Sequence, residues 1–250
     1  MNFLKSFDSI GIIGYGQFGR VLYDILKPRF PEKKIKISSR SNRIDQKKFF
    51  SLEDTVDSDF IIPCVAIRAF EEVIEEISKF IKTGATTMDV NSVKLHPVEV
   101  MEKNLPQGVN IIASHPMWGA GTIKHNENST KNLNMVLWNV RSDENKYKEI
   151  KSFLEDDLEL NLTEMDPDEH DRLSAKFQFL TQVSAQVYKS LGLQETDIDT
   201  KSAILVRELI EIVQADKDLT KDMYVFNPYC KKELELMDKY YSEFKEFLKL

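Results

Sequence analysis

The chain has 250 residues, of which 42% are hydrophobic and 30% are charged, so it is long enough for one large globular domain or two modest ones. Its 34 basic and 41 acidic side chains give a formal net charge of -7, which disfavours a nucleic-acid-binding or anionic-membrane surface, because both need clustered positive charge. An anionic substrate would therefore require a local basic pocket.

Short β-rich runs alternate with helical patterns over the first two thirds of the chain, an order that predicts a parallel sheet flanked by helices. The expected strands cover residues 9–13, 34–38, 59–65, 86–90, 109–113 and 134–140. Apolar residues at helical spacing predict covering helices at residues 18–26 and 69–81. We therefore expect an α/β fold with a Rossmann-type, mostly parallel sheet in an N-terminal domain of residues 1–165.

The pattern changes after Asp166 and Pro167, where strand-like alternation nearly disappears and helical periodicity dominates. This predicts an all-helical second domain at residues 166–250, with helices that include residues 200–213 and 230–250. Its first long helix has an apolar row that we expect to pack, beside a polar row formed by Gln178, Gln182 and Gln186. The apolar row consists of Leu173, Phe177, Leu180, Val187 and Leu191. Apolar helix faces of this kind are often buried against a second copy, so we expect a homodimer.

Two cysteines occur, Cys64 and Cys230, and neither has metal-ligand spacing around it. The sequence therefore favours neither a disulfide framework nor a zinc site. The first residues lack the apolar core of a signal peptide, and the longest apolar stretch, at residues 60–67, is too short to span a bilayer. We expect a cytoplasmic protein.

A glycine-rich turn, GYGQFG, occupies residues 14–19 between the first expected strand and the first expected helix. This is the context that a dinucleotide-binding fingerprint requires. Gly14 would permit the tight turn, Gly16 would let the backbone approach a pyrophosphate, and Gly19 would allow close contact between helix and sheet. The helix N-terminus at Gln17 and Phe18 would supply N–H donors. Residues 1–165 are therefore expected to bind a dinucleotide, the alternative being a purely structural glycine turn.

The end of the second expected strand should meet the adenosine ribose, where NAD-binding proteins place an acidic residue about 20 residues beyond the glycines. This chain has Ser39, Arg40 and Ser41 there. Arginine can pair with a 2′-phosphate, and the serine hydroxyls can donate to the same oxygens. We therefore predict NADP in preference to NAD; in the alternative, Arg40 is a solvated loop residue and either cofactor serves. Cys64 and Val65, at the end of the third strand, complete the expected cofactor site.

Two polar segments follow expected strands, DVNSVK at residues 89–94 and SHPMWG at residues 114–119. The carboxyl ends of the strands in an open α/β sheet share one crevice. We therefore expect Ser92 and His115 to lie beside a bound nicotinamide, with His115 just beyond its strand. A histidine there can take the proton of a substrate hydroxyl while the neighbouring carbon gives up hydride. The alternatives are a core or capping role for His115 and a helix cap at Ser92 before a helix that starts at Val93.

These two segments resemble the paired signatures of the prephenate/arogenate dehydrogenase family, and of its compact plant-type arogenate dehydrogenases in particular. The similarity covers nearly the whole chain and continues through residues 168–171 (DEHD), 178–181 (QFLT), 191–193, 199–201, 218–219 and 226–227. It implies an oxidative decarboxylation in tyrosine biosynthesis, in which hydride passes from the hydroxyl-bearing carbon of a cyclohexadiene to NADP. His115 would accept or hydrogen-bond the hydroxyl proton, and loss of carbon dioxide would restore an aromatic ring.

The resemblance also implies a substrate pocket beside the two motif segments. Lys94 and Lys124 would attract the substrate carboxylates, although an isolated lysine is more often solvated. The wall opposite the cofactor would come from the helical domain, with Gln178, Thr181 and Gln182. Plant-type members carry a histidine where Gln182 stands, so this chain lacks a second imidazole there.

Arogenate carries an ammonium group where prephenate carries a keto group, so acidic pocket residues would favour arogenate. Asp168, Glu169 and Asp171 are candidates, but they equally suit the N-terminus of a helix. Many bacterial relatives bring an arginine to a substrate carboxylate. Arg207 is the only candidate on the relevant helix, and its register does not fit well.

Two other functions remain open at this point. A β-hydroxyacid or imine oxidoreductase of similar layout would need a catalytic lysine on the first long helix of the second domain, where Lys176 has no supporting motif around it. A catalytically silent NADP-binding regulatory protein is suggested by the missing histidine at Gln182. Among these three functions the sequence favours the dehydrogenase of the resembled family, acting on arogenate, prephenate or both.

Overall fold

The computed structural model describes residues 7–213 and 216–249. The start of the chain, which carries the argument about a signal peptide, and Leu250 at the end of the last expected helix lie outside the described residues. Backbone contacts divide the chain into two compact units, Met1–Pro167 and Asp168–Leu250, close to the division expected between residues 165 and 166. No helix within the described ranges is both long and apolar enough to cross a membrane.

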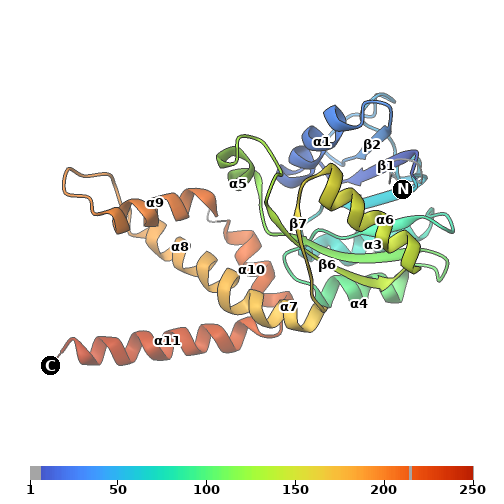
Figure 1. Ribbon diagram of the computed structural model, residues 1–250. Coiled ribbons are helices and arrows are strands. Elements are labelled where there is room, and N and C mark those ends of the chain that lie inside the picture. Colours follow the sequence, from blue (N-terminus) through green and yellow to red (C-terminus); the bar gives the residue numbers. More distant parts are fainter. Residues whose placement is uncertain (1–6, 214–215, 250) are drawn as a thin grey trace. The chain divides into compact units, whose positions relative to one another are not determined.

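The first unit is built on a seven-stranded sheet with the strand order β2-β1-β3-β4-β5-β6-β7 (Figure 1). The strands are β1 (Ser9–Ile13), β2 (Lys34–Ser38), β3 (Phe60–Pro63), β4 (Thr86–Met88), β5 (Asn110–Pro116), β6 (Asn134–Arg141) and β7 (Asn161–Glu164). Strands β1 to β5 are parallel, β6 is antiparallel to β5, and β7 is parallel to β6. The mostly parallel, Rossmann-type sheet predicted from the sequence is confirmed.

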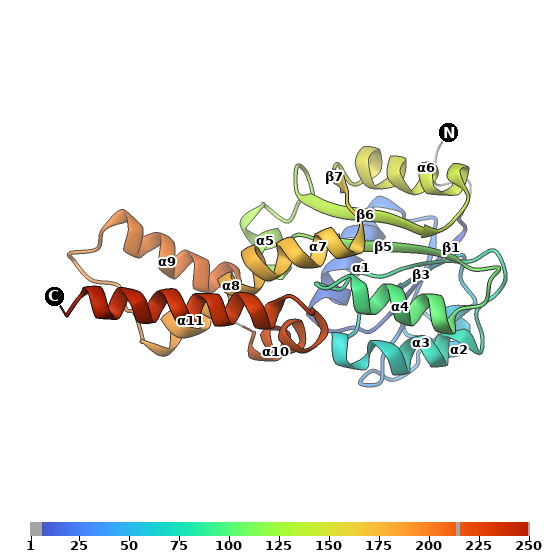
Figure 2. The ribbon, with the colours of Figure 1, turned by 90° about the horizontal axis from the view of Figure 1, so that it is seen from below.

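Helices cover both faces of this sheet. They are α1 (Gln17–Arg29), α2 (Leu52–Val56), α3 (Phe70–Ser78), α4 (Leu95–Asn104), α5 (Ala120–His125) and α6 (Glu144–Ser152), with a 3₁₀ turn at Ile67–Ala69 and a π-helical turn at Phe153–Asp157. One buried cluster joins α1 and α6 to the sheet, and a second joins α3 and α4 to it. Figure 2 shows α3 and α4 side by side, with α6 on the opposite side of the sheet. Strands β1 and β3 are buried on both faces, which explains their continuous apolar runs.

Strand β5 is longer than the sequence predicts, and this changes the setting of His115. The antiparallel neighbour β6 pairs His115 with Val136 and Pro116 with Met135. The expectation that His115 lies just beyond its strand is therefore wrong: it lies within β5. Strand β7 was not predicted, because residues 161–164 are mostly polar and too few to show an apolar alternation.

The second unit is all-helical, as predicted. It contains α7 (Pro167–Ser174), a π-helical turn at Ala175–Phe179, α8 (Leu180–Ser190), α9 (Lys201–Ile212), α10 (Lys217–Phe226) and α11 (Cys230–Phe247). Proline at the first position of α7 suits a helix start, since its missing N–H would have had no partner within the helix.

The apolar row expected to pack on the first long helix of this unit is not buried within the single chain. Phe177, Val187 and Leu191 are 66%, 53% and 66% exposed, whereas Phe179 and Ala185 are buried. The π-helical turn at Ala175–Phe179 has a wider spacing than an α-helix, so it rotates the residues after it relative to those before it.

Candidate active site

The glycine turn closes against the ends of two neighbouring strands. Gly14 has a φ of +103°, and a Cβ there would lie 2.2 Å from the carbonyl oxygen of Cys64. Its N–H donates to the carbonyl of Ser38 at 2.9 Å. A Cβ at Gly19 would lie 2.2 Å from the carbonyl oxygen of Gly14, so both positions require glycine. The ends of β1, β2 and β3 thus meet at the point in the sheet where the strand order reverses direction, which is the ligand-binding position in open α/β folds.

Gly16 differs from the other two glycines, because no described atom lies within 4 Å of the Cβ it lacks. It is the N-cap of α1 and makes no side-chain cap bond, and residues 17–20 contain no acidic group. A helix N-terminus of this kind offers N–H donors and the positive end of the helix dipole to an anion. Open space at Gly16 and N–H groups at Gln17 and Phe18 therefore fit a bound pyrophosphate.

The turn after β2 has no carboxylate available for a ribose hydroxyl. Ser39 Oγ donates to Asn42 Oδ1 at 2.9 Å, and the side chains of Arg40 and Ser41 are exposed. The next acidic residue, Asp45, accepts three backbone N–H groups on one oxygen. These bonds lower the pKa of Asp45 to about 2, so its charge is used to close the loop.

A buried ion pair holds the two motif segments together. Lys94 Nζ donates to Asp89 Oδ2 and to the carbonyl oxygen of Ser114. Asp89 Oδ1 accepts from the N–H of Ser114 at 3.1 Å, Asp89 Oδ2 accepts from the N–H of Asn91 at 3.1 Å, and the Ser114 hydroxyl donates to the Asp89 carbonyl at 2.5 Å. We call these four residues the Asp89 clamp. Burial raises the pKa of the Asp89 carboxyl, and the Lys94 ammonium opposes that shift.

The clamp changes how two expected site residues are understood. Lys94 is 1% exposed and its ammonium is held by Asp89 and Ser114, so it is not a solvated lysine. Its expected contact with a substrate carboxylate stays a prediction. Ser92 is not a helix cap, because α4 begins at Leu95 and its N-cap position is Lys94. The buried Lys94 side chain and the bond from the Asn91 N–H keep residues 91–94 out of the helix.

His115 directly follows the clamped residue Ser114 and is 5% exposed. The carbonyl of Ser114 and the N–H of His115 belong to the same peptide group, so the Lys94 bond fixes the plane from which His115 projects. Pairing with Val136 of β6 fixes the residue from the other side. The backbone of His115 is therefore held by both sheet pairing and a charged hydrogen bond.

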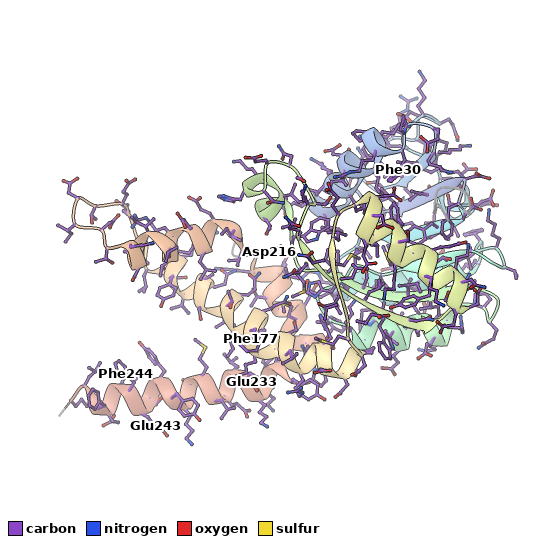
Figure 3. All side chains as sticks on the ribbon, in the orientation of Figure 1. Phe30, Phe177, Asp216, Glu233, Glu243 and Phe244 are labelled. Atoms are coloured by element: carbon purple, nitrogen blue, oxygen red, sulfur yellow. The ribbon has the colours of Figure 1, made fainter. Side chains whose placement is uncertain are left out.

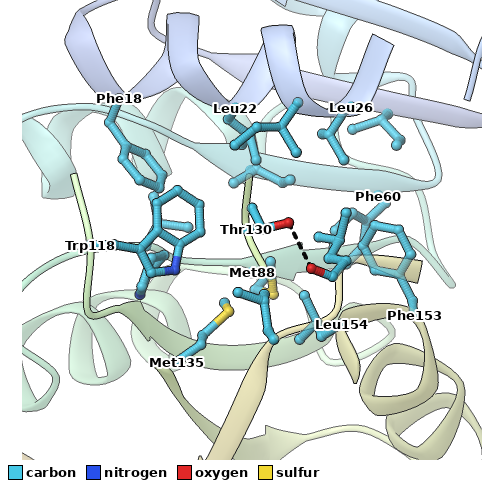
Figure 4. A pocket seen from close by; sticks show the side chains of 17 residues that line it. Phe18, Leu22, Leu26, Phe60, Met88, Trp118, Thr130, Met135, Phe153 and Leu154 are labelled. Atoms are coloured by element: carbon cyan, nitrogen blue, oxygen red, sulfur yellow. Dashed lines mark hydrogen bonds between the residues drawn. The ribbon is translucent and has the colours of Figure 1, made fainter. Parts of the chain in front are cut away.

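An apolar cavity lies in the first unit between α1 and the sheet (Figure 4). The rings of Phe18 and Trp118 lie at one end of it, with their centroids 5.4 Å apart. The hydroxyl of Thr130 lines the cavity but donates to the carbonyl of Leu158 at 2.6 Å. A charged substrate would find no ionic partner here, so the cavity belongs to the packing of the sheet behind the site.

In the second unit, the polar row of the first long helix faces inward. The Gln182 Oε1 atom and both amide atoms of Gln186 are inaccessible to water and have no hydrogen-bond partner among the described residues. Gln178 accepts from Ser174 Oγ at 2.8 Å, and Thr181 Oγ1 donates to the carbonyl of Phe177 at 2.5 Å. Buried amides normally have partners, so these three atoms are exceptions among the described residues.

Other candidate residues make bonds within their own unit. Arg207 pairs with Asp199 and donates to the carbonyl of Gln194, so the structure gives it a partner other than a substrate carboxylate. Asp171 is fully buried and pairs with His170 at 2.8 Å. Lys124 is exposed on α5. Its expected role stays a prediction.

Comparison with known proteins identifies the family. The model of the nucleotide-binding domain of prephenate dehydrogenase matches residues 31–158. The chain belongs to the prephenate/arogenate dehydrogenase family. The match covers the Asp89 clamp and His115, while the glycine turn and the helical unit lie outside it.

Two relatives from Arabidopsis thaliana extend the similarity to most of the chain. Arogenate dehydrogenase 1, chloroplastic, is 30% identical over 90% of this chain and 37% of its own length. Arogenate dehydrogenase 2, chloroplastic, is 26% identical over 96% of this chain and 69% of its own length. The chain thus spans between about a third and two thirds of the length of these curated relatives.

Solved structures show the same fold. Prephenate dehydrogenase from Aquifex aeolicus, in complex with hydroxyphenyl propionate and NAD+, has a TM-score of 0.73 at 20% identity, covering 96% of this chain and 90% of that one. Arogenate dehydrogenase from Synechocystis has a TM-score of 0.69 at 18% identity, covering 96% and 92%. Both the sheet and the helical region therefore have counterparts in this family.

Proposed function

We propose that this protein catalyses the NADP-dependent oxidative decarboxylation of arogenate, prephenate or both. The observation that carries the proposal is the Asp89 clamp, which joins the two family motifs and fixes His115 in β5. The glycine turn supports a dinucleotide, because its conformation and the open space at Gly16 fit a pyrophosphate.

His115 is proposed as the proton acceptor for the 4-hydroxyl group of the substrate. When bound, the nicotinamide supplies the hydride acceptor for the carbon that carries this hydroxyl. As hydride leaves, His115 takes the hydroxyl proton; the bond to the ring carboxylate then breaks, carbon dioxide departs, and its electron pair completes the aromatic ring. The proton returns from His115 to the ring oxygen, so atoms and charge balance. Ser92, in the segment held by the clamp, is proposed to hydrogen-bond the same hydroxyl.

The remaining contacts follow the family arrangement. We propose Ser39, Arg40 and Ser41 for the 2′-phosphate of NADP, and Cys64 and Val65 for the face of the cofactor at the end of β3. Gln178, Thr181 and Gln182 are proposed to contact the substrate, supported by the partnerless amide oxygen of Gln182. Cytoplasmic location stays a prediction, and the Arabidopsis relatives are described as chloroplastic.

We also propose that the helical unit forms a homodimer. Large apolar side chains are exposed along α8, α9 and α11, including Val187, Leu205, Tyr240, Tyr241, Phe244 and Phe247. Figure 3 labels Phe244 among them. Monomeric proteins seldom expose so much apolar surface on several helices of one unit. Sedimentation should show a dimer that Phe244→Asp dissociates, while the control Ile44→Asp, at an exposed apolar residue of the first unit, leaves it intact. A monomeric wild-type protein at micromolar concentration would contradict the proposal.

The test of activity is a matrix of two substrates and two cofactors. Arogenate and prephenate are each incubated with NADP+ or NAD+, and reduced cofactor and carbon dioxide are measured together. Equal amounts of both products with NADP+ support the proposal. Cofactor binding without turnover on either substrate would indicate a regulatory NADP-binding protein instead.

His115→Asn tests the assigned proton acceptor. We expect turnover to fall by about 10²- to 10⁴-fold, the contribution of a positioned acid or base, while the dissociation constant for NADP+ stays unchanged. His125→Asn is the matched control, because His125 is exposed on α5. Unchanged turnover in His115→Asn would remove this residue from the mechanism.

A further inference from the structure

A lysine that no motif identifies is held beside the glycine turn by aromatic rings. Lys48 Nζ lies 4.0 Å from the ring centroid of Tyr23, 4.7 Å from that of Tyr15 and 5.7 Å from that of Phe49. It also donates to the hydroxyl of Tyr15 at 2.5 Å. Tyr15 stands between Gly14 and Gly16, so the Lys48 ammonium is attached to the turn itself.

The backbone of Lys48 is fixed to the end of β2. Its carbonyl accepts from the N–H of Ile37 at 3.0 Å, and Phe50 donates to the carbonyl of Ile37 at 2.8 Å. This pairing adds residues 48–50 alongside the last part of β2. In dinucleotide-binding folds the end of this strand faces the adenosine ribose, whereas the pyrophosphate lies at the helix N-terminus. Lys48 is therefore on the ribose side of the turn.

The charge of Lys48 has no acidic counterpart. No carboxylate among the described residues forms an ion pair with its ammonium, which is half-buried among three rings and one hydroxyl. Aromatic rings attract a cation through their quadrupoles and leave its net charge in place. The Tyr15 hydroxyl accepts from Lys48, so its own proton is directed elsewhere and can be donated to an anion.

We infer that Lys48, held by Tyr15, Tyr23 and Phe49, is a second cationic determinant for the 2′-phosphate of NADP, acting together with Arg40. This inference rests on the dinucleotide site of the proposed function. The rings fix the ammonium in one position, so little side-chain entropy is lost when the phosphate binds. The phosphate would receive a charged hydrogen bond from Lys48 and a second bond from Tyr15.

The test compares binding of NADP+ and NAD+ to the full chain by calorimetry. Lys48→Met should weaken NADP+ binding about ten- to hundredfold, the range of hydrogen bonds to charged groups, and change NAD+ binding by less than about twofold. Lys47→Met is the matched control, since Lys47 is the exposed neighbouring lysine, and both affinities should stay unchanged in it. Tyr15→Phe keeps the ring and should weaken NADP+ binding by a smaller factor.

Each other result overturns the inference. An equal loss for NADP+ and NAD+ in Lys48→Met would mean that Lys48 supports the loop or the pyrophosphate, and no loss for either would mean that it contacts no cofactor phosphate. Wild-type protein that binds NAD+ as tightly as NADP+ would also rule out a 2′-phosphate site. These are binding measurements, so absence of turnover on arogenate and prephenate would instead count against the proposed reaction.

Discussion

Replacing Lys94 by methionine should destabilise the first unit by about 3–5 kcal/mol at neutral pH, because it leaves a buried carboxylate without its counterion. The side chains of Lys94 and Asp89 are 2% and 0% exposed, so water cannot replace the lost ammonium. Asp89 would keep only the N–H groups of Asn91 and Ser114, each at 3.1 Å.

The penalty should depend on pH in a defined direction. Burial raises the pKa of Asp89 and Lys94 opposes this, so the folded-state pKa rises further in Lys94→Met. A carboxyl whose pKa is higher in the folded than in the unfolded state contributes its stability below the unfolded value, about 3.9, and loses it as the pH rises through the folded value. The variant should therefore be closer to wild type at about pH 4 than at about pH 8.

Urea unfolding followed by tryptophan fluorescence measures this directly, since both tryptophans, Trp118 and Trp138, lie in the first unit. The exposed Lys124→Met is the control, with an expected change within about 0.5 kcal/mol. Asp89→Asn combined with Lys94→Met should recover part of the loss, because no unpaired charge remains. A loss below about 1 kcal/mol, or one that is equal at about pH 4 and about pH 8, would refute the reasoning.

Three further experiments test other parts of the structure. Gly16→Ala should fold normally and lose affinity for both cofactors. Gly14→Ala should lower the unfolding midpoint in urea, because its Cβ would meet the Cys64 carbonyl. Equal stability of the two variants would contradict this prediction. Burial raises the thiol pKa of Cys64, and it raises that of Cys230 to about 12, so alkylation by iodoacetamide at neutral pH should be slow until urea unfolds the chain. Burial opposes ionisation of Asp59, yet Lys82 and neighbouring N–H groups lower its pKa to about 2. Asp59→Asn should therefore reduce the free energy of unfolding at neutral pH. The difference from wild type should vanish as the pH falls from about 4 to about 2.

The sequence predicted the strands in which several successive residues are buried. Strands β1 and β2 match their expected residues, because apolar side chains in both are covered by the same unit. The roles of Gly14, Gly16 and Gly19 were also predictable from the sequence. Where φ is positive, or where another group must approach the backbone closely, glycine is the residue that fits.

The contacts that depend on tertiary pairing were not predictable. The extension of β5 through His115 requires β6 to run antiparallel beside it, and the bond between Lys48 and Tyr15 joins residues that are 33 positions apart. Lys94 carried a sequence signal as part of a motif, but its burial depends on the approach of β5 to β4. The packing row that includes Phe177 is exposed in the single chain, so its burial stays a prediction that depends on contacts with a second copy.

The position of His115 inside β5, paired with Val136 of β6 and next to the clamped Ser114, has a consequence for how the site responds to ligands. A residue in a paired strand has its backbone ordered during folding, so little backbone entropy remains to be lost there when substrate arrives. Its amide should exchange with solvent deuterium as slowly as the sheet core, with or without cofactor. Any movement that admits and encloses the substrate must then occur in other segments, around a histidine that stays in place.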